Sequence, residues 1–115
     1  MGHASFSKKD LHLIEVAWGK TVTVFGPENV GAQFARVKIT EYGPGMVHKK
    51  HRHPGQEEIM YVLEGRGISR TESGDQPMMP GTFVFIPADT DHVSINLEKD
   101  KPLKAIIIKS PPGDA

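Results

Sequence analysis

Cysteine is absent from this chain, which excludes a disulfide framework and a thiolate metal site. Long hydrophobic runs are absent too. No segment approaches the roughly 20 apolar residues of a membrane-spanning helix, and residues 1–10 have no apolar stretch of signal-peptide length. Neither sign of charge is in excess, because 14 basic residues balance 14 acidic ones. This balance argues against nucleic acid or an anionic membrane as the main partner. Because a chain without cysteine also fits a reducing compartment, we expect a cytoplasmic protein.

Strand signals dominate the rest of the chain, and no long helix is predicted. Short segments rich in β-branched and aromatic residues recur about every ten residues, with most of the nine prolines and twelve glycines between them. With 115 residues the chain can bury one core but not two. We therefore predict an all-β fold, either a sandwich or a small barrel, over residues 11–115. Residues 1–10 are predicted to form a polar arm, which could be disordered or swapped onto a neighbouring molecule.

The individual strands are predicted from alternation and from the turn residues that end each segment. Segment 11–18 fits either a short strand or a helical turn. Segment 67–72 is expected to form a hairpin with 58–63. The predicted strands are 21–25, 34–40, 58–63, 67–72, 82–86, 92–97 and 103–109, and the predicted turns are 26–29, 42–45, 73–75 and 87–89.

Residues able to bind a metal are concentrated between positions 45 and 65. Three histidines, His48, His51 and His53, fall within six residues, and Glu58 follows a Pro-Gly break. On a strand, His51 and His53 would place both rings on one face, because side chains alternate between faces. Two imidazoles and a carboxylate that converge suit a divalent transition metal. The interspersed lysines and arginine leave a solvated loop as the alternative interpretation.

A second segment, residues 81–96, contains a further candidate ligand. It combines a short apolar strand, a turn that begins at Pro87, and a strand that begins with His92. Asp89 can supply the residue at which the chain reverses, because aspartate tolerates the left-handed conformation better than most residues. His92 would then face into a barrel from the start of its strand.

The two segments together resemble the two motifs of the cupin family. The first motif consists of Gly, five residues, His, one residue, His, three or four residues, Glu, six residues and Gly. It is matched over residues 45–65 by Gly45, His51, His53, Glu58 and Gly65. The second consists of Gly, five residues, Pro, one residue, Gly, two residues, His, three residues and Asn. It is matched over residues 81–96 by Gly81, Pro87, His92 and Asn96, with Asp89 in place of the second Gly.

The resemblance implies a single-domain jelly-roll β-barrel that holds one divalent metal ion in its mouth. Carried over residue by residue, the implied ligands are His51, His53, Glu58 and His92. The first motif also allows a three-residue gap that would select Glu57, but Glu58 preserves the six-residue gap to the closing glycine. Iron, manganese, nickel, zinc and copper all accept three imidazoles and a carboxylate, and the sequence does not choose among them.

Other residues are candidates for the pocket on alternation alone. Arg36 is interpreted as a surface charge, with a reach into the mouth as the alternative, and His48 as a rim residue that could contact substrate. For the Phe and Met candidates, ordinary core packing is the favoured interpretation and a place in the pocket is the alternative. The pocket-lining candidates are Met60 and Val62 on the face of Glu58, Ser94 and Asn96 on the face of His92, and Phe83 and Phe85 as an apolar wall.

The resemblance does not fix the activity, because one fold hosts many functions. The leading hypothesis is a dioxygenase-like oxidoreductase that activates a small oxygen-containing substrate at the metal. The alternatives are a sugar or uronate isomerase or lyase, and a metabolite-binding protein without catalysis. In each case the expected partner is a small molecule. The run 106–108 is apolar on both faces of its strand, so a homodimer is also predicted.

Overall fold

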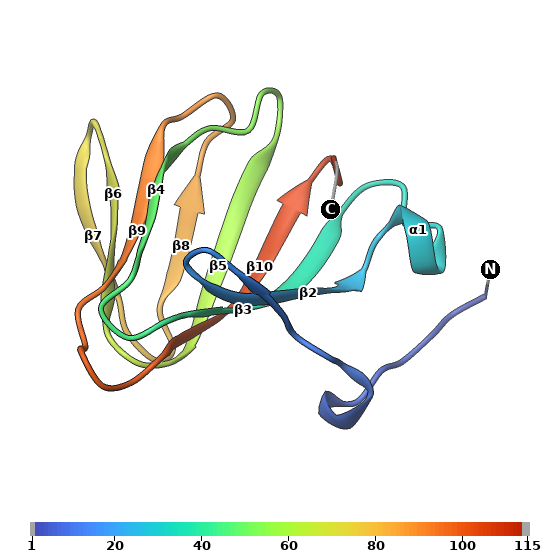
Figure 1. Cartoon of the computed structure of the whole chain (residues 1–115). Coiled ribbons are helices and arrows are strands. Elements are labelled where there is room, and N and C mark those ends of the chain that lie inside the picture. The colour runs from blue at the N-terminus through green and yellow to red at the C-terminus, as the bar shows by residue number, and fades with distance from the viewer. Residues whose placement is uncertain (1, 114–115) are drawn as a thin grey trace.

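The computed structural model describes residues 2–113, which form ten strands in two antiparallel sheets (Figure 1). One sheet has the strand order β1-β2-β3-β10-β5-β8, and the other has the order β4-β9-β6-β7. Two single-turn helices, η1 (Lys8–Asp10) and α1 (Pro27–Val30), complete the structure. The all-β prediction is therefore confirmed. The strands are β1 (Ile14–Val16), β2 (Gly19–Phe25), β3 (Arg36–Tyr42), β4 (Val47–His51), β5 (Glu57–Glu64), β6 (Gly67–Thr71), β7 (Gly74–Met78), β8 (Phe83–Ile86), β9 (His92–Asn96) and β10 (Leu103–Ser110).

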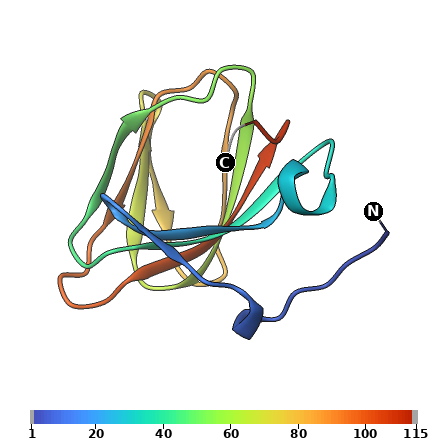
Figure 2. The same ribbon diagram turned by 45° about the vertical axis from the view of Figure 1, so that its right-hand side comes forward.

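The two sheets face each other across one shared core (Figure 2). Alternate side chains of the central strands point into this core, as the two-residue period requires. No strand ladder joins the two sheets within residues 2–113, so the predicted jelly roll is built as two facing sheets. The same stretch contains no helix with the length and apolar character needed to cross a membrane. The core consists of Tyr42, Met60, Val62, Met78, Val84, Ile86, Leu103, Ala105 and Ile107, with Trp18 packed against it.

The predicted hairpin between 58–63 and 67–72 is wrong, because the chain changes sheets between these segments. Strand β5 pairs with β10 and β8, whereas β6 pairs with β9 and β7. Two glycines allow this crossing. Gly65 has φ +96, and a Cβ there would lie 2.6 Å from the carbonyl oxygen of Pro102. A Cβ on Gly67 would lie 2.4 Å from the carbonyl oxygen of Ile95, so neither position has room for a side chain.

Three short elements were not predicted as such. Strand β7 was missed because its sequence lacks apolar alternation and contains Pro77. Proline is tolerated there because β7 is an edge strand, in which outward-facing N–H groups need no partner. Strand β4 is charged and occupies the other edge of the same sheet. Helix α1 was predicted as part of a turn, and it begins with Pro27 at its first position, where a missing N–H has no cost. Segment 11–18 contains the short strand β1.

Residues 2–10 form an exposed arm that runs away from the two sheets (Figure 1). Helix η1 is the only regular element of the arm within the described chain, and the side chain of Asp10 accepts hydrogen bonds from Ser7 at its start. The ring of Phe6 stacks on Phe25, with 5.6 Å between ring centroids, so the arm contacts strand β2. Exchange of the arm with a neighbouring molecule stays a prediction.

Arg36 is 2% exposed, so its interpretation as a surface charge is wrong. It lies on the inner face of β3, near one end of the sheet, where several groups accept its hydrogen bonds. The guanidinium pairs with Glu28 of α1 and donates to the hydroxyl of Thr23 at 3.0 Å. It also donates to the carbonyl oxygens of Pro112 at 3.1 Å and Gly113 at 3.0 Å. Arg36 therefore attaches α1 and the C-terminal segment to the sheet rather than binding a ligand in the mouth.

Replacement of Arg36 by methionine is expected to lower the free energy of unfolding by about 2–4 kcal/mol, because one buried and several partly buried hydrogen bonds of the guanidinium are lost. The change can be measured by urea denaturation. Glu28→Gln should cost less, since the Glu28 side chain is half exposed and the carbonyl acceptors of Arg36 remain. Equal losses in the two variants would contradict this account.

Candidate metal centre

Three histidines from separate positions in the sequence converge between the sheets. His51 ends β4, His53 lies in the loop that leads to β5, and His92 begins β9. The pairing of β4 with β9 sets His51 directly opposite His92. One ring nitrogen of each histidine lies within 4.8 Å of the others. The two strands and one loop thus bring together three nitrogen ligands that a single ion could share.

Backbone carbonyls fix the orientation of two of these rings. Nδ1 of His51 lies 2.7 Å from the carbonyl oxygen of Lys49, and Nδ1 of His92 lies 2.9 Å from that of Thr90. A carbonyl can only accept, so Nδ1 carries the proton in both rings. The other nitrogen, Nε2, is then left with a lone pair when the ring is neutral. This arrangement is the usual one for histidines that bind a metal through Nε2.

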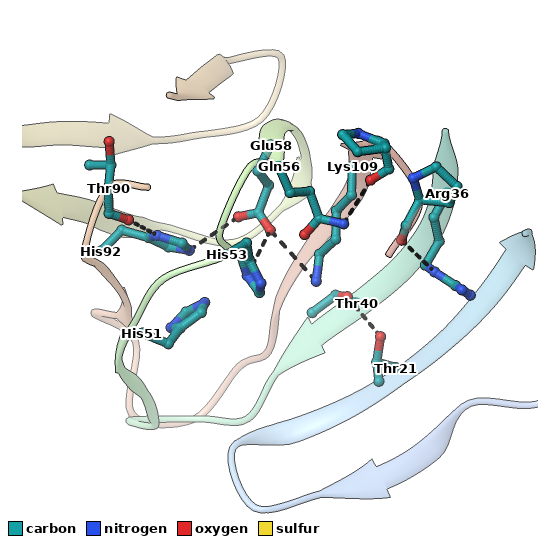
Figure 3. A network of polar contacts seen from close by, with 12 residues as sticks. Thr21, Arg36, Thr40, His51, His53, Gln56, Glu58, Thr90, His92 and Lys109 are labelled. Carbon is teal, nitrogen blue, oxygen red and sulfur yellow. Dashed lines mark hydrogen bonds and ion pairs between the residues drawn. The ribbon is translucent and has the colours of Figure 1, made fainter. Parts of the chain in front are cut away.

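Glu58 brings a carboxylate to the same point from the opposite sheet (Figure 3). Its side chain is buried, with Oε1 3.7 Å from Nε2 of His53 and Oε2 3.5 Å from Nε2 of His92. The neighbouring residue Glu57 is exposed, as alternation along β5 requires. The structure therefore places Glu58, and not Glu57, beside the histidines.

The donor set fits a divalent transition metal. The Nε2 atoms of His53 and His92 are buried and have no hydrogen-bond partner among residues 2–113. The oxygens of Glu58 are too distant to serve as good acceptors or donors for them. Buried polar atoms normally have a partner, and a bound ion would provide one for both. Imidazole nitrogens and a carboxylate oxygen suit iron, manganese, nickel, zinc or copper.

The electrostatic environment holds two of the histidines in the neutral form that binds metals. Burial lowers the pKa of His53 to about 4, and the positive charge of Lys109 adds to this effect. Burial also lowers the pKa of His51. Both rings are therefore neutral near neutral pH, and no proton has to leave them before an ion can bind.

His92 and Glu58 instead favour their charged forms as a pair. Burial opposes the charge on His92, but the nearby carboxylate of Glu58 outweighs it, and the pKa of His92 is raised. Burial likewise opposes the charge on Glu58, but His92 and Lys109 outweigh it and lower the pKa of that carboxyl. Without an ion, the charge on Glu58 is thus balanced by protein groups alone.

A stack of rings supports His51 from the side. The ring of His48 lies between Trp18 and His51, with centroid distances of 4.2 Å and 3.9 Å and interplanar angles of 22° and 23°. Burial lowers the pKa of His48 to about 3, so it is neutral at the pH at which proteins usually work. His48 thus packs against a candidate ligand ring, and Trp18 covers it. Trp18 was not predicted at the site, because its segment fits either a short strand or a helical turn.

Two lysines face the candidate ligands from the six-stranded sheet. Lys38 of β3 and Lys109 of β10 line a small cavity of about 40 Å³ together with His51 and Glu58. Nζ of Lys109 lies 3.8 Å from Oε1 of Glu58. Neither lysine was predicted from the sequence to face the site, because a lysine on a strand normally faces solvent. Alternation gives the signal that was available, since Lys38 has the same parity as the buried Arg36 on its strand.

Residues 38–109 match the model of the cupin domain. The chain belongs to the cupin family. Among solved structures, it is similar to KdgF from Halomonas sp., with a TM-score of 0.85, 21% identity, and coverage of 98% of this chain and 97% of that one. At this identity the likeness concerns the fold alone.

Two curated relatives match about half of the chain. One is an uncharacterized protein, MJ1618, from Methanocaldococcus jannaschii, 36% identical over 62 residues, or 54% of this chain and 49% of the relative. The other is an oxalate-binding protein from Thermotoga maritima, 33% identical over 64 residues, or 56% of this chain and 50% of the relative. The chain thus matches these curated relatives over about half of their length.

Of the remaining apolar pocket candidates of this cupin, two are exposed and two belong to the core. Phe83 and Phe85 are 72% and 57% exposed on the outer face of β8, so the prediction that they line the pocket is wrong. Met60 and Val62 share the inner face with Glu58 and belong to the hydrophobic core. Two larger hollows, of about 580 and 590 Å³, include none of the candidate metal ligands. Phe83 and Phe85 line the second of these hollows, together with the inward-facing Val84 and Ile86.

The two polar candidates on β9 are both buried but differ in their contacts. The amide of Asn96 donates to the carbonyl oxygens of Tyr42 at 3.2 Å, Gly43 at 3.0 Å and Lys101 at 2.8 Å. Asn96 therefore joins three chain segments at the far end of β9 from His92 rather than facing the ligands. The hydroxyl of Ser94 has no hydrogen-bond partner within the described residues, but Ser94 is not among the residues that line the cavity beside the candidate ligands.

Asp89, which stands where the cupin motif has glycine, joins the two motifs. Its φ of +60 shows that it adopts the left-handed conformation expected at this position. Its carboxylate accepts a hydrogen bond of 3.1 Å from the backbone N–H of Gly55, two residues after His53. A glycine could adopt the same conformation but could not make this bond. Asp89 thus fixes the loop that presents His53.

We expect Asp89→Gly to weaken metal binding about three- to tenfold, because the loop of His53 loses an anchor while the backbone conformation remains accessible. Asp89→Asn keeps both an acceptor and tolerance of positive φ, so it should bind metal nearly as well as the unchanged protein. Competition with a chelator measures both affinities. Identical affinities in all three proteins would show that the hydrogen bond to Gly55 has no role in the site.

Proposed function

We propose that this cupin is an enzyme that uses a divalent metal ion, held by His51, His53, Glu58 and His92, to activate a small oxygen-containing substrate. The observation that carries the proposal is the pair of buried, unpartnered Nε2 atoms beside the Glu58 carboxylate. Four protein ligands leave open positions on a five- or six-coordinate ion. A bound ion would supply Lewis acidity and, if redox-active, electron transfer to oxygen.

The protein groups around the ligands favour a reaction in a restricted space. Trp18 and His48 cover one side of the cavity, and Lys38 and Lys109 lie on another. The cavity volume of about 40 Å³ has room for about three water-sized groups. Only a small substrate, or one end of a larger one, can enter it. The dioxygenase-like oxidoreductase remains our first hypothesis for the reaction.

A second candidate reaction is the isomerisation or elimination of a sugar acid, with the ion as Lewis acid only. The specific observation in its favour is the pair of lysines, since ammonium groups suit the carboxylate of such a substrate. A protein that binds a metabolite without turnover is the third hypothesis. The intact set of four potential ligands supports catalysis over binding alone.

The first experiment is elemental analysis of the protein, purified without an affinity tag, beside the double variant His51→Ala/His92→Ala. We expect nearly one divalent ion per chain in the unchanged protein and almost none in the variant, because two of three nitrogen ligands are lost. Circular dichroism controls for folding. A protein that takes up no divalent ion on titration would refute the proposed function.

Reaction assays then separate the three hypotheses in the metal-loaded protein. Oxygen uptake with catechol-like or diketone substrates would support the dioxygenase. Ring opening or isomerisation of uronates without oxygen uptake would support the second reaction. Ligand binding without turnover would support the third hypothesis.

We further propose that the enzyme is a homodimer that pairs the outer faces of the six-stranded sheets. Two apolar rows cross four neighbouring strands on this face, as the strand registers show. The two rows cover about 19 Å across the strands and about 13 Å along them, or roughly 250 Å² before the protrusion of the side chains is counted. This is about a third of the roughly 800 Å² per partner of a standard interface. The rows are Val37, Ile108, Ile59 and Phe85, and Ile39, Ile106, Tyr61 and Phe83.

A second copy is the occupant that suits this face, because two identical apolar faces match each other around a twofold axis. We expect Phe83→Glu/Phe85→Glu to convert the dimer to a monomer, since the charges would be buried against apolar side chains. Light scattering after size exclusion gives the mass. Phe34→Glu is the matched control, because Phe34 is 79% exposed in the loop before β3 and outside the two rows. A monomeric unchanged protein would rule out the dimer.

A further inference from the structure

Lys38 and Lys109 occupy neighbouring positions on the inner face of the six-stranded sheet. The strand register places Lys109 directly between Arg36 of β3 and Glu58 of β5. It places Lys38 opposite Ile107, one inward position along β10 from Lys109. Both lysines are partly buried and line the cavity that contains His51 and Glu58. Two ammonium groups and the candidate metal ligands therefore border the same small space.

Within the described chain, Lys38 has no negative partner, and Lys109 shares the only carboxylate that it approaches. Arg36 pairs with Glu28, and Lys104, on the outer face of β10, lies 3.4 Å from Glu64. Lys38 makes no ion pair with any residue between 2 and 113. Lys109 approaches Glu58 at 3.8 Å.

Glu58 cannot balance the whole site. Its carboxylate also lies beside His53 and His92, and under the proposed function it is a ligand of the ion. A divalent ion, two ammonium groups and one carboxylate leave the loaded cavity with an excess of positive charge. A partly buried charge without a partner is unfavourable, so an anion that enters the cavity would be stabilised.

The other walls of the cavity define how an anion would fit. The hydroxyl-bearing residues Thr40 and Tyr42, the rings of Trp18 and His48, and Ile107 complete the lining. A volume of about 40 Å³, with room for about three water-sized groups, accommodates a carboxylate but not a sugar ring in full. Carboxylates form stronger hydrogen bonds with ammonium groups than neutral hydroxyls do, because both donor and acceptor are then charged.

We propose that Lys38 and Lys109 bind a carboxylate of the substrate, so that the substrate is a small organic acid, or the acid end of a sugar acid, held between the lysines and the metal ligands. This inference rests on the proposed function, because it takes the ion as present. The wall of the cavity that contains Lys38 and Lys109 then determines which substrates bind. Lys38, which has no ion pair of its own, supplies the larger share of the preference for an anion.

The test measures the binding of glycolate and galacturonate to the zinc-loaded protein by calorimetry, with glycolamide and galactose as their neutral counterparts. We expect at least one acid to bind, and its neutral counterpart to bind much more weakly. Lys38→Met should weaken binding of that acid about tenfold, the typical effect of one charge-assisted hydrogen bond. Lys38→Arg should restore most of the affinity, and Lys104→Met, the matched control on the outer face, should bind like the unchanged protein.

The zinc content of every sample distinguishes a failure of the lysine site from a failure of the proposed metal site. Unchanged zinc content with equal acid binding in Lys38→Met and the unchanged protein would overturn the lysine site and leave the metal site intact. No acid binding by the zinc-loaded unchanged protein would overturn it as well. Failure of the unchanged protein to hold zinc or any other divalent ion would refute the proposed function instead. Lys109→Met provides a second variant if Lys38→Met does not fold, and the same weakening is expected of it.

Discussion

The buried carboxylate of Glu58 is the constraint around which the rest of the site is arranged. It lies on a central strand of the six-stranded sheet, 4% exposed, where an unbalanced charge would be very unfavourable. Its positive or potentially positive neighbours come from three places: His92 from the facing sheet, His53 from the loop before β5, and Lys109 from the adjacent strand. The contact with His92 joins the two sheets at the mouth, where no backbone ladder does so within residues 2–113.

The residues that approach Glu58 could largely be predicted from the sequence, because motif spacing encodes their positions. Two motifs located three histidines and a glutamate, and alternation explains why Glu58 rather than Glu57 faces inward. Asp89 was also expected in its left-handed conformation. The spacing did not show that the Asp89 carboxylate binds Gly55, since a hydrogen bond between two loops depends on how the sheets bring those loops together.

What could not be predicted depends on contacts between distant segments. The segment that contains Phe83 and Phe85 is apolar at every position, so its pattern gives no indication of which face is buried. The register of β8 against β5, with Ile86 opposite Glu58, decides this and turns both phenylalanines outward. Arg36 was misjudged for a related reason, because its partners Glu28 and Pro112 come from a helix and a terminal segment that only the tertiary fold brings together.

The division of the cavity into two walls explains why the metal ligands alone do not determine the reaction. Three imidazoles and a carboxylate serve oxidative and purely Lewis-acid chemistry alike, so the donor set does not select one activity. The opposite wall is contributed by β3 and β10, whose inward positions near the mouth are occupied by lysine. Strand pairing fixes where these side chains stand but places no demand on their charge, so they can vary without altering the fold. The choice of substrate should therefore be encoded on this wall, and the capacity for chemistry on the wall formed by His51, His53 and His92.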